Sequence, residues 1–264
     1  MIGQIFNKRK IDYWAERNAF PRFIVITGRE GFGKATMVKY ITDKMKHYII
    51  YADISVDSVR EVIKNSYNLV SPTVYIFLNA HKMSAQAKNA LLKVTEEPPN
   101  MAYFILTSNS MEQLLPTIES RCAHLPLEPY TEAQLKEYCD ADFIKYAQCP
   151  GDIEKLKTLN ISKLEQLCDD IIEYCQSGLL SDAFILFSDM KFKDTDVEGY
   201  EVNIVISMLN YKLCEKYVNT GNPNYSLMSV RLNEARHKMN TYNISKENEF
   251  AGFLISSRLL WCRG

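Results

Sequence analysis

The first half of the chain alternates short apolar runs with segments of helical periodicity. The apolar runs read as buried strands and occupy residues 23–27 (FIVIT), 48–52 (YIIYA), 73–78 (TVYIFL) and 102–107 (AYFILT). Helical periodicity fills the segments between them, at residues 35–46, 57–66 and 84–97. Ser84 is a residue type that begins helices, and the two prolines at 98 and 99 end this one. Strands that alternate with helices predict an α/β domain with a parallel sheet.

After about residue 130 the strand pattern stops and only helical periodicity remains. It is found at residues 131–138, 153–159, 161–175, 179–187, 197–217, 225–240 and 245–261. Gly151, Gly178 and the segment 220–224 interrupt it. We therefore expect an α/β domain over residues 1–128, a small helical, lid-like domain over 129–160 and an all-α domain over 161–264.

Composition and charge describe an ordinary globular protein. Hydrophobic residues make up 47% of the 264 residues, charged residues make up 24%, and the net charge is −1. A nearly neutral surface does not predict general nucleic-acid binding, so any DNA contact needs a local patch or a partner chain. The apolar runs are too short to cross a bilayer, and the N-terminus lacks the apolar core of a signal peptide. We expect a cytoplasmic protein without membrane contacts.

The cysteines and histidines do not predict a metal site. Seven cysteines are scattered along the chain, at positions 122, 139, 149, 168, 175, 214 and 262. None forms a Cys-x-x-Cys pair, and their odd number argues against a disulfide framework, so we expect buried, reduced thiols. His81 and His124 stand alone in the sequence and are expected to be structural rather than metal ligands.

A glycine-rich turn, GREGFGK at residues 28–34, follows the first strand and begins a helix. This is the setting of a phosphate-binding loop, whose glycines let backbone N–H groups approach phosphate. Its lysine reaches the outer phosphates. The predicted nucleotide contacts in this loop are Gly28, Gly31, Gly33 and Lys34.

The residues that would hold Mg²⁺ at this loop are missing. The position after the lysine normally supplies a Ser or Thr hydroxyl to the metal, but here it is Ala35. Thr36 is the nearest hydroxyl and lies roughly 100° further around the helix, so it is a candidate contact only in a weak or vestigial site. The strand at 73–78 should be followed by a metal-binding acid, but ends in Leu78 and Asn79. Two losses in one function predict that the chain does not hydrolyse ATP at its own site.

The segment 73–99, TVYIFLNAHKMSAQAKNALLKVTEEPP, resembles subunits that load sliding clamps for DNA polymerases. The resemblance is to the bacterial gamma and delta-prime type of the AAA+ family, and NALLK and EEPP are its most specific parts. YFILTSN at 103–109 resembles the family's sensor-1 strand, and LLPTIESRC at 114–122 resembles its arginine-finger helix end. The matches together cover about residues 22–160.

This resemblance implies roles for individual residues and for the assembly. Asn109 is the implied nucleotide sensor, with Thr107 as a second choice. Arg121 is the implied arginine finger, acting on ATP held by a neighbouring subunit; the alternative is a local ion pair with Glu119 or Glu128. The region 161–264 takes the place of the family's collar, where subunits associate. The implied partners are other clamp-loader subunits, the sliding clamp and primer–template DNA.

The chain also departs from the ATP-hydrolysing members of this family. They carry an Asp-Glu pair where this chain has Leu78-Asn79, and a four-cysteine zinc module where residues 34–73 contain no cysteine. Their sensor-2 arginine is replaced by Glu154, an acid that would repel phosphate. These departures point to the delta-prime role, a subunit that lends its arginine finger to a neighbour. The compact design and the missing zinc module fit a phage-encoded or divergent loader.

Three further surfaces are predicted on general grounds. Because family helices line a spiral around DNA, Lys82 and Lys88 are candidate phosphate contacts, against the alternative of ordinary surface lysines. The run Lys8-Arg9-Lys10 is expected to be a solvated charged turn. Apolar stripes of the C-terminal region are expected to face partner subunits, at Ile204, Val205, Met208, Leu209, Leu254, Ile255, Leu259 and Leu260.

Three functions are compatible with the sequence. The chain is a non-hydrolysing clamp-loader subunit, an active ATPase of such a loader with an atypical Mg²⁺ site, or a stand-alone AAA+ adaptor such as a helicase loader or repair factor. The first predicts stimulation of a partner's ATP turnover, and the second predicts turnover by this chain. The third predicts no dependence on a clamp.

Overall fold

The computed structural model describes residues 2–177, 190–192, 200–242 and 244–262. The chain forms two compact units, Met1–Pro129 and Tyr130–Gly264. The helix predicted at 179–187 and the start of the one predicted at 197–217 lie outside the described residues.

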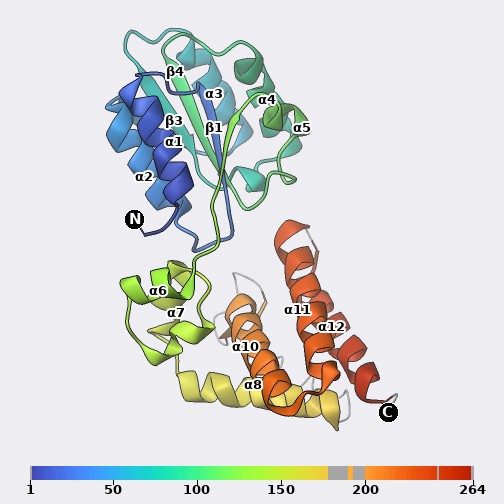
Figure 1. Ribbon diagram of the computed structural model, residues 1–264. Coiled ribbons are helices and arrows are strands. Elements are labelled where there is room, and N and C mark those ends of the chain that lie inside the picture. The colour runs from blue at the N-terminus through green and yellow to red at the C-terminus, as the bar shows by residue number, and fades with distance from the viewer. Residues whose placement is uncertain (1, 178–189, 193–199, 243, 263–264) are drawn as a thin grey trace. The chain divides into compact units, whose positions relative to one another are not determined.

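A five-stranded parallel sheet forms the centre of the first unit (Figure 1). Its strand order is β2-β3-β4-β1-β5. All residues of β1 and β3 are buried, because helices cover both faces, and this explains why these strands are continuous apolar runs. The predicted parallel α/β fold is confirmed. The strands are β1 (Phe23–Thr27), β2 (Tyr48–Ala52), β3 (Thr73–Phe77), β4 (Ala102–Ser108) and β5 (Ala123–Pro126).

Helices cover the two faces of this sheet (Figure 1). On one face, α1 (Ile5–Glu16) and α2 (Lys34–Met45) share an apolar core with the sheet that includes Ile11, Met37 and Ile76. The other face is covered by α3 (Val56–Ser66), α4 (Ala85–Glu96) and the short α5 (Pro116–Glu119). Ser84 caps α4 as predicted, because its hydroxyl accepts a hydrogen bond from the Ala87 N–H. A 3₁₀ turn, η1 (Ala80–Lys82), follows β3.

Two elements of this unit do not follow from the sequence pattern. Lys8-Arg9-Lys10 lies within α1 and not in a charged turn, so that prediction is wrong. The helix was not recognised because it buries only Asn7 and Ile11, too few positions to produce a visible periodicity. β5 was missed because Leu125 is its only buried residue.

The second unit is almost entirely helical. Gly151, read as a break in the sequence, lies inside the first turn of α7, where a helix tolerates glycine. A short parallel pair, β6 (Met190–Lys191) and β7 (Tyr200–Glu201), precedes the long helices. The helical elements are α6 (Glu132–Tyr138), η2 (Asp142–Tyr146), α7 (Pro150–Leu156), α8 (Ile161–Gln176), α10 (Val202–Thr220), α11 (Pro223–Thr241) and α12 (Lys246–Trp261).

The core of the second unit is built around α10. Six consecutive residues of this helix, 204–209, are buried, so other elements enclose the first half of the helix on all sides. Ile204, Val205, Met208 and Leu209 therefore belong to the chain's own core, as does Leu254 of α12, and the expectation that they face partner subunits is wrong. The three remaining residues of that set do not share this burial: Ile255 and Leu259 are exposed, and Leu260 is partly buried.

Neither disulfides nor membrane-spanning helices are found in the described part of the chain. Cys149, Cys168 and Cys175 are buried, whereas Cys214 and Cys262 are exposed. No helix there is both long and apolar enough to cross a bilayer.

Candidate functional site

The glycine-rich loop joins the end of β1 to the start of α2, as its sequence predicts. Gly31 and Gly33 have φ angles of 82° and 89°, in the left-handed region that side chains disfavour. Gly28 is required for a different reason. A Cβ atom at this position would lie 3.0 Å from Cβ of Leu127, which follows β5. The loop therefore depends on glycine both for its turn and for its packing against a neighbouring segment.

Lys34 and Asn109 meet at this loop. The Lys34 ammonium donates hydrogen bonds to the carbonyl oxygen of Gly28, at 2.6 Å, and to Oδ1 of Asn109, at 3.0 Å. Asn109 directly follows β4, which pairs with β1 and so brings the two strand ends together. The structure thus places the predicted sensor beside the predicted phosphate-binding lysine. The oxygens in these two contacts are uncharged.

His81 extends this network and was not recognised as part of it from the sequence. Its Nε2 lies 3.3 Å from Nδ2 of Asn109, and its Nδ1 is buried without a hydrogen-bond partner in the described part of the chain. Burial, followed by the charges of Lys34, Lys82 and Lys88, lowers the pKa of His81 to about 4. The imidazole is therefore neutral at neutral pH. Its position in the turn after β3 was the available signal, since parallel strand ends converge on one edge.

The positions that would bind Mg²⁺ carry no suitable ligand. Ala35 and Thr36 are exposed at the start of α2, and Leu78 and Asn79 are exposed where β3 ends. The Asn79 N–H donates to Oγ1 of Thr107 at 2.9 Å, so the second-choice sensor binds the chain's own backbone. In the residues that the structure describes, no group of three or more His, Cys, Asp or Glu side chains could hold a metal ion.

Arg121 lies at the surface just after α5. Its Nη1 donates to the carbonyl oxygen of Thr117 at 3.1 Å, and its Nη2 lies 3.4 Å from Oε1 of Glu96. The local ion pair therefore exists, but its acid is Glu96 of α4 and not Glu119 or Glu128. Both side chains are substantially exposed, and exposed pairs contribute only about 0–1 kcal/mol. The guanidinium thus contacts α4 and α5, but these contacts are too weak to hold it in one position.

The neighbouring Cys122 has the character of a packing residue. Burial, followed by the charge of Glu119, raises the pKa of this thiol to about 11. A thiol that stays protonated at neutral pH is a poor nucleophile, in agreement with the structural role expected from the sequence.

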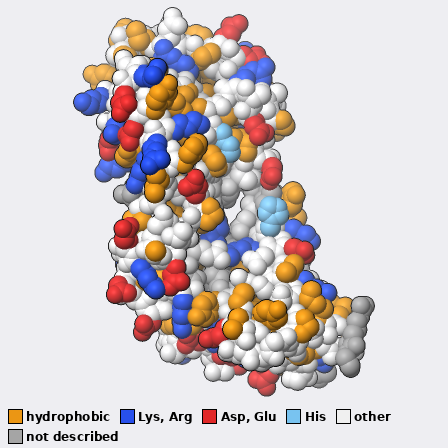
Figure 2. Space-filling model, viewed as in Figure 1, with side chains coloured by type: hydrophobic (Ala, Val, Ile, Leu, Met, Phe, Trp, Pro, Cys, Tyr) orange, Lys and Arg blue, Asp and Glu red, His pale blue; other side chains and the backbone are white. Residues whose placement is uncertain are grey.

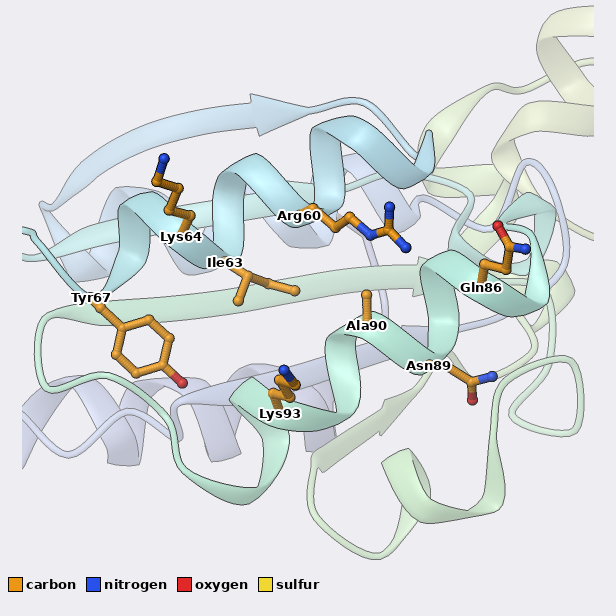
Figure 3. Close-up of a pocket in the computed structure, with 8 residues that line it drawn as sticks. All are labelled: Arg60, Ile63, Lys64, Tyr67, Gln86, Asn89, Ala90 and Lys93. Atoms are coloured by element: carbon orange, nitrogen blue, oxygen red, sulfur yellow. The ribbon is translucent and has the colours of Figure 1, made fainter.

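A groove of about 900 Å³ runs between α3 and α4 (Figure 3). Both helices present residues at the spacing of one helix face, and the lining contains three cations, two amides and one phenol but no carboxylate. Such a lining favours an anionic ligand of the phosphate type. Its members are Arg60, Ile63, Lys64 and Tyr67 on the α3 side and Gln86, Asn89, Ala90 and Lys93 on α4.

The lysines predicted to contact DNA lie outside this lining. Lys82 is exposed in η1. Lys88 is half-buried, and its ammonium donates to the carbonyl oxygen of Gln113 at 2.7 Å. Burial also lowers its pKa. On the face of the first unit that Figure 2 shows, Lys and Arg side chains are interspersed with acidic and apolar ones.

Glu154, the predicted sensor-2 position, lies in α7 of the second unit. Its Oε1 accepts hydrogen bonds from Lys157 at 2.8 Å and from the Tyr138 hydroxyl at 2.9 Å. These bonds, that of Lys157 first, lower the pKa of Glu154, so the side chain is negatively charged at neutral pH. The sensor-2 position inferred for Glu154, where an acid would repel phosphate, stays a prediction.

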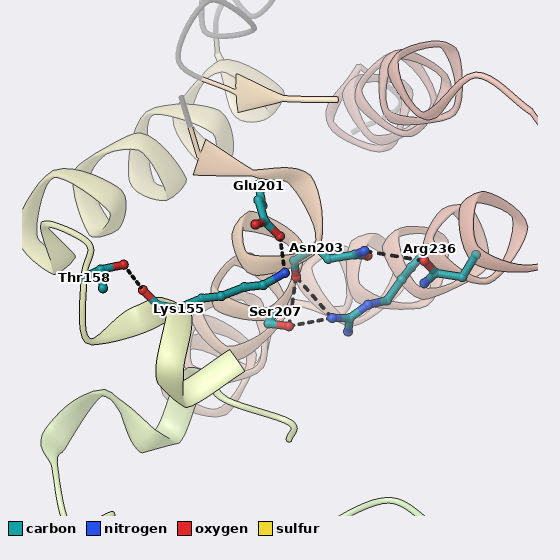
Figure 4. Close-up of polar contacts among 7 residues, drawn as sticks. Lys155, Thr158, Glu201, Asn203, Ser207 and Arg236 are labelled. Carbon is teal, nitrogen blue, oxygen red and sulfur yellow. Dashed lines mark hydrogen bonds and ion pairs between the residues drawn. The ribbon is translucent and has the colours of Figure 1, made fainter. Parts of the chain in front are cut away.

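Polar contacts in the second unit tie its smaller helices to the long ones (Figure 4). Lys155 of α7 pairs with Glu201 of β7 at 2.5 Å. Arg236 of α11 donates to Oγ of Ser207 at 2.5 Å and to the carbonyl oxygen of Asn203 at 3.2 Å, both on α10. Because Arg236 and Ser207 are buried, this contact fixes the register of α10 on α11.

Part of the chain, mostly in the first unit, is similar in sequence to known proteins. Residues 38–131 match the family described as DNA polymerase III, delta subunit. The DNA polymerase III gamma subunit of Buchnera aphidicola subsp. Schizaphis graminum is 37% identical over 112 residues, which are 40% of this chain and 30% of that protein. This part of the chain is therefore similar in sequence to DNA polymerase III subunits of the delta and gamma type.

The clamp-loader likeness reaches into the second unit at lower identity. The gamma/tau subunit of Mycoplasma genitalium is 27% identical over 232 residues, 75% of this chain and 37% of that protein. A crystal structure of a DNA polymerase III gamma subunit-related protein from Thermotoga maritima superposes with a TM-score of 0.51 and 18% identity, covering 94% of this chain and 98% of that one, which shows the shared fold. The chain spans well under half the length of both curated relatives.

Proposed function

We propose that the chain is a non-hydrolysing, delta-prime-like subunit of a sliding-clamp loader that supplies Arg121 to ATP bound by a neighbouring subunit. The first part of the argument is the loss of metal ligands. A Ser or Thr after the loop lysine and an acid after the adjacent strand hold Mg²⁺ in enzymes of this type. Here those positions are Ala35, Leu78 and Asn79.

The observation that carries the proposal is the set of contacts made by Lys34. Its ammonium binds the Gly28 carbonyl and the Asn109 amide, so groups of the chain itself already hold this side chain. A nucleotide phosphate would have to displace or join these bonds. This arrangement supports weak or absent nucleotide binding at the chain's own loop and leaves ATP to the interface with another subunit.

The second part of the argument is that the arginine persists although the metal site has been lost. Arg121 contacts residues of α4 and α5 and is exposed, which leaves it accessible to a neighbouring protein. A guanidinium is planar and always charged, so it can stabilise the charge that develops on a phosphoryl group during transfer. Fingers of this kind contribute roughly 10³–10⁵ in rate.

Primer–template DNA is the further partner that the proposal includes. The groove between α3 and α4 offers three cations on adjacent helix faces, which supports a contact with the phosphate backbone. The other loader subunits and the sliding clamp complete the proposed set of partners. The proposed place of action is the cytoplasm of a bacterium or of a phage-infected host cell.

The test is Arg121→Ala in a loader reconstituted with its partner subunits. The loader should assemble normally, while clamp- and DNA-stimulated ATP hydrolysis should fall at least about tenfold, equivalent to about 1.4 kcal/mol of transition-state stabilisation. Arg121→Lys should recover little of the rate, because an ammonium lacks the planar fork of a guanidinium.

Glu96→Ala is the matched control for this experiment. It removes the local ion pair of Arg121 while leaving the guanidinium in place. If Arg121 acts on a neighbour, Glu96→Ala should keep the wild-type rate. If Arg121 acts only through its local pair, Glu96→Ala should reproduce the loss. A loader with Arg121→Ala that hydrolyses ATP at the wild-type rate would exclude the proposed role.

A further inference from the structure

The outer edge of the sheet is apolar and open. Among the residues that the structure describes, β2 is the last strand of the sheet and pairs with β3 on one side only. Four consecutive residues of this strand, Tyr48, Ile49, Ile50 and Tyr51, are between 43% and 71% exposed. Natural proteins usually protect an edge strand with lysine, proline or a covering element, because an open apolar edge pairs readily with another strand.

The backbone of β2 has a defined side available for pairing. The Tyr48 N–H donates to the carbonyl oxygen of Pro72 at 3.1 Å, so the N–H and C=O groups of Tyr48, and of Ile50 two residues further on, face β3. Because these groups alternate in direction along a strand, those of Ile49 and Tyr51 face outward. A strand added at this edge therefore forms its hydrogen bonds with Ile49 and Tyr51.

The charges at the two ends of the strand select the occupant and its direction. Lys46 lies just before β2 and Asp53 directly after it, and both are exposed. A second copy of β2 that runs antiparallel brings the Lys46 end of each strand to the Asp53 end of the other, whereas a parallel copy would bring like charges together. The edge is therefore complementary to itself in one orientation.

We propose that two copies of this chain associate through β2, edge to edge and antiparallel, about a two-fold axis. Hydrogen-bonded pairs in an antiparallel ladder join outward-facing residues of both strands, so Ile49 pairs with Tyr51 of the second copy. This register places Ile50 on the axis, and the two Ile49–Tyr51 contacts are of the β-branched and aromatic type that stabilises sheets. Since such an interface needs neither nucleotide, clamp nor DNA, the inference goes beyond the proposed function.

Sedimentation velocity on the full chain tests this association. The wild-type chain should shift from monomer to dimer over roughly a hundredfold range of concentration, because dimerisation follows mass action. Ile49→Pro removes an outward N–H that β3 does not use. Ile50→Lys places two like charges at the axis. Each variant should weaken the dimer at least about tenfold, which corresponds to 1.4 kcal/mol.

Val70→Lys is the matched control, because Val70 is 97% exposed and lies outside β2. It introduces the same lysine and should leave the dimer unchanged. Circular dichroism and thermal melting of each variant should match the wild type, which separates loss of pairing from loss of folding.

A charge exchange tests the orientation separately. Lys46→Asp and Asp53→Lys should each weaken the dimer, since each places like charges opposite one another. The double variant should restore it, because the attraction is kept with its signs reversed. A wild-type chain that stays monomeric, or that forms open-ended aggregates in place of a dimer, overturns the proposal. So does a dimer that tolerates Ile49→Pro and Ile50→Lys as well as it tolerates Val70→Lys.

Discussion

Lys34 shows how a phosphate loop that lacks metal ligands can hold the ammonium of its lysine by hydrogen bonds within the same chain. Its hydrogen-bond acceptors include a backbone carbonyl and an amide, and the amide is in turn next to His81. The three strand ends that carry these groups are adjacent in the sheet, so the network spans the edge where a nucleotide would bind. Any nucleotide must compete with bonds that are already made.

We predict that the isolated chain hydrolyses ATP at the background rate, indistinguishable from Lys34→Ala, and that any nucleotide binding is weak and insensitive to Mg²⁺. The reason is the loss of metal ligands at Ala35, Leu78 and Asn79. The measurements are phosphate release and calorimetric titration of ATP with and without EDTA. Turnover well above that of Lys34→Ala would favour the alternative of an active ATPase. Acids introduced at 78 and 79 should not restore turnover unless Ala35→Thr accompanies them.

His81 makes the stability of the first unit depend on pH. Its pKa is about 4 in the folded chain, below the 6.5 of an unperturbed histidine, because burial disfavours the charged form. The unfolded chain therefore binds a proton first as the pH falls. The contribution of His81 to stability is complete above pH 6.5 and declines between pH 6.5 and about 4.

The prediction is that His81→Gln flattens this decline, since glutamine keeps hydrogen-bonding capacity but does not titrate. The measurement is the urea midpoint at pH 7 and pH 5, followed by tryptophan fluorescence. The chain has two tryptophans, one in each unit, so Trp261→Phe leaves Trp14 as the reporter of the first unit. An equal pH dependence in His81→Gln and its parent would contradict the assigned pKa.

At the residue scale, the sequence predicts what depends on spacing along the chain. The loop glycines, Lys34 and Asn109 were selected by motif, and the structure brings the lysine and the asparagine into contact. Two findings were not predictable in this way. The partner of Arg121 is Glu96 of a different helix, and His81 joins the network only because separate strand ends converge. Both depend on tertiary distance, which a single sequence does not contain.

Among the secondary-structure elements, the strongest functional signal is the pair α3 and α4. Each helix presents a stripe to the same groove, and neither stripe is conspicuous alone. We predict that Arg60→Ala, Lys64→Ala and Lys93→Ala each weaken binding of primed DNA by the reconstituted loader. Each should also reduce the slope of log affinity against log salt by about 1, because each removes one phosphate contact.

Two control variants accompany this measurement of DNA affinity and its salt dependence. Lys39→Ala removes an exposed lysine from α2, on the other face of the sheet, and should change neither affinity nor salt slope. Lys88→Ala tests the earlier sequence prediction directly. Its ammonium is bound to the Gln113 carbonyl, so we expect little effect on DNA. A loss at Lys88 with none at the groove residues would favour the sequence prediction over the groove.

Most elements were predictable from the apolar surface that they bury. The ends of β1, β3 and β4 were found within one residue, because continuous burial leaves continuous hydrophobic sequence. The strand β2 was found from its apolar run, although its side chains are exposed. α1 and β5 were missed, since they bury one or two residues each and complete the sheet from its margins. Short elements of this kind are stabilised by what they pack on, and their own sequence carries little signal.

At the scale of the whole molecule, four exposed apolar residues of the second unit lie on α11 and α12. Arg231 donates to the carbonyl oxygen of Ser256, which sets these positions side by side. The two helices run antiparallel. Leu227, one turn before Arg231, and Leu259, one turn after Ser256, therefore lie at the same end of the helix pair. Together with Val230 and Ile255 they form what we call the α11–α12 patch, whose members are 43–52% exposed.

We predict that the α11–α12 patch contributes to the association with partner subunits. Leu227→Lys and Leu259→Lys should reduce co-purification at least about tenfold, with stability changes within about 0.5 kcal/mol because both side chains are at the surface. Val218→Lys on α10, at a residue that is 79% exposed, is the control and should have no effect. Undiminished recovery of partners by both patch variants would place the contact elsewhere.

The enclosure of α10 decides how the chain can be divided in an experiment. Tyr146 and Leu156 belong to the same apolar core as this helix, although they lie well before it in the sequence. A fragment that begins near residue 161 would lose these side chains and leave part of an all-round apolar helix facing water. Such a fragment would associate with other proteins whether or not they are its natural partners. The boundary that keeps the core whole lies between Pro129 and Tyr130. A pull-down made with any shorter fragment would measure non-specific association through exposed apolar surface and not specific recognition of a partner.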